Sequence, residues 1–173
     1  MLLLLILIVI FLFAMTGFHR GGVASALHLG STFFSLWVAS RFYQPLSHYS
    51  KLFIPYPRTR AYETDFVVAL DHHEARFNHI VVFLLIVIVI KTMMYLVINS
   101  FDQLFETQRM AMFNRLTGAF VACCSAFICL HYICFLFALF PDATLQNALA
   151  HSMTGQWFVT EVPLLSEFTL NLK

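Results

Sequence analysis

Long apolar stretches alternate with more polar ones along this chain of 173 residues. Four of the apolar stretches are long enough to cross a bilayer as helices, because about 20 residues rising about 1.5 Å each span its hydrocarbon core. We expect these four helices at about residues 1–18, 21–40, 80–101 and 116–140. The pattern therefore predicts an all-α membrane protein that forms a single integral membrane domain over residues 1–173.

The polar segments also carry apolar residues at helical spacing. Within the loop at 41–79, apolar residues recur near every third or fourth position between 63 and 77, which predicts a short amphipathic helix on the membrane surface. In the tail at 141–173, Trp157 indicates a second segment at the interface. We therefore expect short interfacial helices in both the loop and the tail.

A glycine-rich hairpin joins the first two predicted helices through Gly17, Arg20, Gly21 and Gly22. Glycine adopts backbone conformations closed to other residues and leaves room for a neighbouring backbone. We therefore expect a tight turn with close contact between helices at this point.

Small residues recur four apart on two of the helices. One stripe lies on the second helix and its counterpart on the fourth: Gly22, Ala26, Gly30 and Gly118, Ala122, Ala126. Small side chains at this spacing let helices approach closely in lipid, so the two stripes predict contact between the second and fourth helices. The stripe on the second helix has two interpretations, packing within the chain and self-association.

Lys91 lies in the middle of the third span, directly after the eleven-residue apolar run Ile80–Ile90. An ammonium near the bilayer centre costs about 2.5–3.5 kcal/mol to insert, so it usually pairs, faces a watery cavity or marks a pathway. No carboxylate lies in the predicted spans, and the candidate partners are His28, His131 and helix-end carbonyls. A buried site at Lys91 and a snorkelling or locally distorted helix both remain open.

His28 and His131 lie inside apolar runs of the second and fourth helices. A neutral imidazole that is hydrogen-bonded to a neighbouring helix is the default interpretation for such a residue. A proton or ligand role together with Lys91 is the alternative.

Composition and charge argue against several classes of function. Hydrophobic residues make up 60% of the chain and the net charge is +1, so nothing indicates nucleic-acid binding. The four cysteines share one apolar run without the spacing of a zinc site, and His72 and His73 are adjacent rather than on one helical face. We expect no metal and no cofactor. The motifs of serine hydrolases, zinc proteases and phosphate-binding loops are also missing, so we do not expect an enzyme.

Basic residues give conflicting evidence on orientation. Arg20 flanks the first helix on its hairpin side only, which favours both termini outside, because the first helix usually dominates. Against this, six Lys/Arg lie in the long loop and tail and three in the two opposite loops. We expect an N-out, C-out topology.

Three motifs recur in a fixed order along the chain: Gly17-Phe18-His19-Arg20-Gly21 after the first helix, Phe113-Asn114-Arg115-Leu116-Thr117-Gly118 before the fourth, and Pro163-Leu164-Leu165-Ser166 in the tail. Through their order and spacing the chain resembles, over essentially its whole length, the bacterial colicin V production protein (CvpA) family. The segment Phe53-Ile54-Pro55-Tyr56-Pro57 is similar to one found in a Gram-positive branch of this family. The chain departs from the family at residues 122–126, where glycine and arginine are frequent in relatives.

The resemblance implies a multi-pass protein of the bacterial plasma membrane that is linked to bacteriocin export and envelope processes, without an agreed molecular activity. Some relatives carry a trypsin-like protease domain that works outside the cytoplasm after the last helix, which supports an outside C-terminus.

Two hypotheses on function follow. The first is a non-enzymatic oligomeric component, channel-like or a scaffold, which contacts the bilayer, further copies of itself and envelope or export proteins. The second is a small transporter or proton-coupled carrier that uses Lys91 with His28 and His131.

Overall fold

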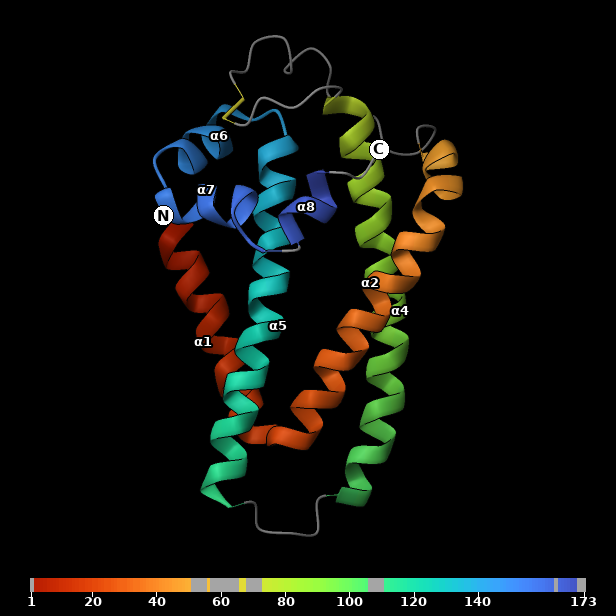
Figure 1. Cartoon of the computed structure of the whole chain (residues 1–173), viewed down its shortest axis with the longest axis vertical. Coiled ribbons are helices and arrows are strands. Elements are labelled where there is room, and N and C mark those ends of the chain that lie inside the picture. The colour runs from red at the N-terminus through yellow and green to blue at the C-terminus, as the bar shows by residue number, and fades with distance from the viewer. Residues whose placement is uncertain are drawn as a thin grey trace.

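The computed structural model describes residues 2–50, 56, 66–67, 73–105, 111–163 and 165–170 (Figure 1). The elements it contains are α1 (Leu2–Arg20), α2 (Gly22–Ser50), α4 (His73–Phe105), α5 (Met112–Leu139), α6 (Ala143–Ala150), α7 (Met153–Thr160) and α8 (Leu165–Leu170). The four long helices α1, α2, α4 and α5 have the length and composition needed to cross a membrane. The predicted all-α membrane protein with four transmembrane helices is therefore confirmed.

The four long helices pack as two pairs that meet along α5. Helix α1 lies against α5 and α2 lies against α4, and α5 also contacts α2. The start of α1 and the short helices α6 to α8 lie at one end of the bundle, and the α1–α2 hairpin lies toward the other (Figure 1). We call this second end the hairpin end.

Two of the helices extend beyond their predicted ends. Helix α2 continues past Arg41 to Ser50, with Pro45 inside it, and α4 begins at His73 rather than near residue 80. A charged side chain ends the stretch that lipid covers, but it does not end the hydrogen-bonded helix. Arg41 instead lies over the Trp37 ring, with its Cζ atom 6.0 Å from the ring centroid.

Two predicted surface segments are only partly described. Of the amphipathic helix expected at 63–77, the structure describes residues 66–67 and 73–77, and residues 73–77 form the first turns of α4. Most of the segment at 53–57 lies outside the described residues.

The tail packs into the bundle instead of lying only on the surface of the membrane. Helices α6 and α7 begin at side-chain caps, since Asp142 accepts from the Thr144 and Leu145 amides and Ser152 accepts from the Gly155 amide. Leu149 and Phe158 are buried, and α7 packs on α5. The tail therefore completes one end of the helical core.

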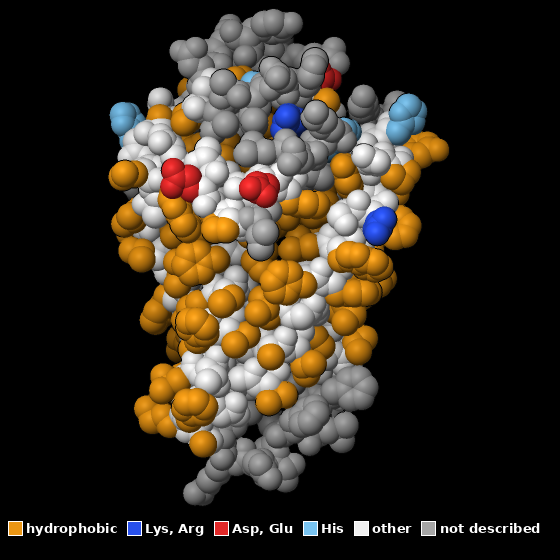
Figure 2. Space-filling model, viewed as in Figure 1, with side chains coloured by type: hydrophobic (Ala, Val, Ile, Leu, Met, Phe, Trp, Pro, Cys, Tyr) orange, Lys and Arg blue, Asp and Glu red, His pale blue; other side chains and the backbone are white. Residues whose placement is uncertain are grey.

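The outer surface of the bundle is apolar. Large exposed hydrophobic side chains include Phe11 on α1, Trp37 on α2 and Phe120 on α5. Figure 2 shows hydrophobic side chains over the middle and lower part of one face, with the acidic side chains on that face near the top. This distribution suits lipid chains around the helices, whose backbone groups are paired internally.

Candidate functional site

The two glycine motifs at the hairpin end meet each other. An added Cβ at Gly118 of α5 would overlap the Gly17 carbonyl oxygen and lie 2.6 Å from the Gly21 carbonyl carbon. Gly21 has a φ of 83°, which favours glycine. The backbones of α1 and α5 therefore touch here, and we call this contact, made by Gly17, Gly21 and Gly118, the joint.

Asn114 and Arg115 support the joint from the start of α5. The Asn114 side-chain oxygen accepts a hydrogen bond from the Gly22 amide at 2.9 Å, which caps the first turn of α2. The Arg115 guanidinium lies over the Phe18 ring, 5.8 Å from its centroid. The hairpin motif and the Asn-Arg motif, far apart in sequence, thus form one structural unit.

The two small-residue stripes do not face each other. Helices α2 and α5 are in contact, as predicted, but Ala26 and Gly30 are exposed and a Cβ added at Gly30 would meet nothing within 4 Å. On α5, Ala126 is buried and Ala122 packs against Gly17 of α1. The reason is that α2 turns a different face inward.

The inward face of α2 is polar. Buried serines and a histidine recur along it every three or four residues: Ser25, His28, Ser31, Ser35. Polar side chains that face lipid are costly, so a polar stripe on a membrane helix turns toward protein. This polar periodicity identifies the inward face of α2, which the pattern of small residues does not identify.

Lys91 binds this polar face. Its Nζ donates to the His28 carbonyl oxygen at 2.5 Å, to Ser31 Oγ at 2.6 Å and to Thr32 Oγ1 at 2.7 Å. All three ammonium hydrogens therefore have acceptors on α2. Of the predicted partners, the structure brings His28 to Lys91, through its backbone carbonyl.

His131 lies elsewhere and holds the tail. Its Nδ1 is 2.6 Å from the Phe158 carbonyl oxygen of α7, and its Nε2 is 3.1 Å from Thr169 Oγ1 of α8. Since a carbonyl oxygen only accepts, Nδ1 carries a proton. The structure thus gives His131 a hydrogen-bonding role between helices and does not bring it to Lys91.

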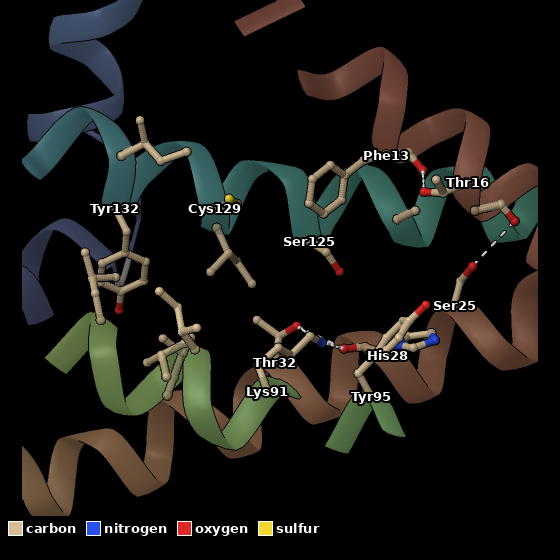
Figure 3. A pocket seen from close by; sticks show the side chains of 18 of the residues that line it. Phe13, Thr16, Ser25, His28, Thr32, Lys91, Tyr95, Ser125, Cys129 and Tyr132 are labelled. Atoms are coloured by element: carbon tan, nitrogen blue, oxygen red, sulfur yellow. Dashed lines mark hydrogen bonds between the residues drawn. The ribbon is translucent and has the colours of Figure 1, made fainter. Parts of the chain in front are cut away.

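A cavity of about 560 Å³ lies between the two helix pairs. Lys91, His28 and Tyr95 lie on one side of it, and Ser125, Cys129 and Tyr132 of α5 on the opposite side (Figure 3). Its volume falls in the range of about 300–1,000 Å³ that small-molecule sites occupy. Sequence reasoning missed this cavity, because it depends on how far apart the helix pairs stand.

The two ends of the cavity differ in chemistry. At the hairpin end its walls include Thr16, Arg20, Ser25 and Tyr95, whereas the opposite end is lined by aliphatic side chains: Leu36, Leu84, Ile133 and Leu136. The antiparallel course of the helices brings these residues together, since α1 and α4 run toward the hairpin end and α2 and α5 run away from it (Figure 1). The cavity is therefore amphipathic along its length.

Aromatic contacts lie beside the apolar end of the cavity. Phe83 of α4 packs on Tyr132 of α5 with ring centroids 5.5 Å apart, and on Phe168 of α8 at 5.7 Å. Tyr132 is buried, and its hydroxyl has no hydrogen-bond partner among the described residues. The tail thus packs beside this end of the cavity.

Arg20 and Lys91 dominate the electrostatics of the cavity. The Arg20 Cζ lies 5.6 Å from the Tyr95 ring centroid, and the Tyr95 ring lies 5.6 Å from the His28 ring. In the part of the chain that the structure describes, the residues that line the cavity include both cations and no Asp or Glu. Among the described residues no group of three His, Cys, Asp or Glu could hold a metal ion.

Comparison with known proteins identifies a family. A sequence model described as colicin V production protein matches residues 3–163, which is nearly the whole chain. No curated protein and no solved structure matches significantly. The match spans all four membrane helices together with the motifs of the joint, and the chain belongs to the colicin V production protein family.

Proposed function

We propose that this protein is a non-enzymatic, self-associating membrane component of export or envelope processes, such as colicin V production. Family membership supports the process, and the four apolar helices support the location in a membrane. The bacterial plasma membrane, with both termini outside, is part of the proposal. Tags placed beside Arg20 and at Lys173 would test this topology by their accessibility in intact cells.

The outward stripe on α2 carries the self-association part of the proposal. Ala26 and Gly30 lie on the exposed face of α2, with Val23, Phe33 and Trp37 exposed beside them. A small-residue patch flanked by bulky side chains lets a second helix approach its backbone closely. Gly22, at the start of the same stripe, is packed within the chain against Thr117 and does not contribute.

The position of Lys91 favours a scaffold over a channel. If the protein formed a ring-shaped pore, we would expect Lys91 to face the central axis between the subunits. Lys91 instead points into its own chain and binds α2.

Particle mass in lipid nanodiscs tests self-association. We expect a homo-oligomer that Gly30→Leu converts largely to monomer, because the leucine would separate the helices. Thr92→Leu is the matched control, since Thr92 is exposed on α4 and donates only to Ile88 within its own helix. A monomeric wild type, or equal behaviour of the two variants, would contradict the proposal.

A carrier is the second candidate, favoured by the cavity beside Lys91. It would use Lys91 and His28, while His131 holds the tail. This candidate predicts that Lys91→Met abolishes bacteriocin export and leaves membrane insertion intact. Unchanged export in Lys91→Met would exclude it.

A further inference from the structure

We propose that the cavity binds an anionic membrane lipid, with the headgroup at the hairpin end near Arg20 and Lys91 and one chain extending toward Leu84 and Leu136. A scaffold and a carrier could both use such a site, so this inference goes beyond either function. It rests on the charge of the cavity, on the hydrogen-bond donors that its two cations leave unused, and on its apolar remainder.

The first argument is unbalanced charge. Arg20 and Lys91 both line the cavity, and no acidic side chain is found among its described lining residues. Two cations in a low-dielectric space repel each other and are costly to keep there. An anion between them would lower this cost, whereas a neutral ligand would not.

The second argument concerns the hydrogen-bond donors of Lys91 and Arg20 that are not already used within the protein. Lys91 donates all three of its ammonium hydrogens to acceptors on α2. It can therefore attract an anion through its charge but has no hydrogen left to donate to it. Arg20 has five N–H groups, and its guanidinium lies over the Tyr95 ring with no hydrogen bond or ion pair among the described residues. Arg20 is therefore the group that would bind headgroup oxygens, with Tyr95 orienting it.

The third argument is the apolar remainder of the cavity. Beyond Lys91 the walls are mainly aliphatic, together with Tyr132, whose ring packs on Phe83. A soluble anion such as phosphate would leave this part empty, and an empty apolar cavity loses the packing contacts of its walls. A lipid chain fills it, so an amphiphile matches both halves of the cavity at once.

The geometry also matches the way a lipid lies in a leaflet. Arg20 and the polar residues near it come from the turns beside the α1–α2 hairpin, which lies toward one end of the bundle (Figure 1), whereas Leu84 and Leu136 come from parts of α4 and α5 that are farther from the hairpin. A lipid that enters sideways from that leaflet would keep its headgroup near the interface and its chain along the helices. No inversion of the lipid is needed.

Native mass spectrometry of the purified protein tests this site. Phosphatidylglycerol and phosphatidylcholine with identical chains are added in parallel, and the retained lipid is counted. We expect preferential retention of phosphatidylglycerol. Arg20→Gln should lower that retention about tenfold, since a charge-assisted hydrogen bond is lost.

Two further variants separate charge from shape. Ser125→Phe fills the cavity and keeps both cations, and it should also reduce phosphatidylglycerol retention. Arg115→Gln is the matched control, because Arg115 is a cation at the same end that lies over Phe18 and does not line the cavity. It should leave retention unchanged.

Three results would overturn the proposal. Equal retention of the two lipids would show that charge plays no part. Equal losses in Arg20→Gln and Arg115→Gln would place the lipid at the general surface. Inorganic phosphate that displaces phosphatidylglycerol fully at equal concentration would show a simple anion site without a place for the chain. Self-association is measured separately by particle mass, so its failure would leave this result intact.

Discussion

The joint and the cavity lie next to each other on α5, yet they are packed in opposite ways. At the joint, Gly17 and Gly118 bring the backbones of α1 and α5 into contact. About two turns further along α5, at Ser125, the helix pairs separate around about 560 Å³ of space. Helices in lipid gain little from apolar contact alone, so close packing requires small residues.

The four long helices are therefore packed tightly at the joint and are separated by a cavity farther along α5. The joint fixes the helix pairs at one end, and the contact of Phe83 with Tyr132 fixes them near the other. Between these points Lys91 is bound to α2, which holds α4 against α2 and away from α5. We infer that the joint serves stability and that the cavity serves binding.

The largest expected effect comes from breaking the joint. Gly118→Leu would drive a side chain into the Gly17 carbonyl, and we expect a loss of more than about 3 kcal/mol, enough to prevent recovery of folded protein. Fluorescence-detected size-exclusion chromatography measures the recovery. Gly30→Leu, with open space around it, should be recovered at the wild-type level. Equal recovery of the two would mean that the joint is no tighter than the outer surface.

The next largest loss of stability is expected when the contact between His131 and the tail is removed. His131→Ala removes two buried hydrogen bonds and leaves the Phe158 carbonyl unpaired, at a cost of about 3 kcal/mol. His131→Asn should recover part of this loss, because its amide can still donate to that carbonyl. Thermal unfolding in detergent measures both variants. A wild-type midpoint for His131→Ala would show that the tail is not held by His131.

A smaller effect is expected from the cap at the joint. Asn114→Ala leaves the Gly22 amide without its acceptor and should cost about 1 kcal/mol. Asn147→Ala, at an exposed position of α6, serves as the control in the same thermal assay. Indistinguishable midpoints would mean that Asn114 does not support the hairpin.

The smallest effect is expected at the apolar end of the cavity. Tyr132→Phe removes a buried hydroxyl that has no partner among the described residues, so stability should stay the same or rise by up to about 1 kcal/mol. A clear loss of stability would show that this hydroxyl binds a group such as water or lipid.

The sequence predicted the spans better than it predicted their packing. Four long apolar runs predict four membrane helices because the length of a bilayer crossing is fixed, and the family assignment rests on motifs with a set order. The ends of α2 were predicted less well, since Arg41 ends the apolar run without ending the helix. His28 was one of several candidate partners for Lys91, and its backbone carbonyl rather than its imidazole accepts the hydrogen bond.

The candidate site depends on how the helices are rotated and how the tail packs, and the spacing of residues in the sequence does not determine either. The stripes of α2 and α5 have the same spacing, yet Gly30 is exposed and Gly118 is packed, because rotation of α2 is decided by its polar face. His131 and His28 both lie inside apolar runs, so the sequence does not distinguish their roles. The structure does, because His131 is hydrogen-bonded to the tail. The polar periodicity of α2 would have been the better guide.

The central claim is that a lipid chain occupies the space between the helix pairs. Phosphatidylglycerol with a photoreactive diazirine near the end of one chain, activated in nanodiscs and mapped by peptide mass spectrometry, tests it most directly. We predict adducts on the cavity walls at residues 84–88 of α4 and 128–136 of α5. Adducts confined to outward-facing side chains such as Phe11, Trp37 and Phe120 would contradict the claim.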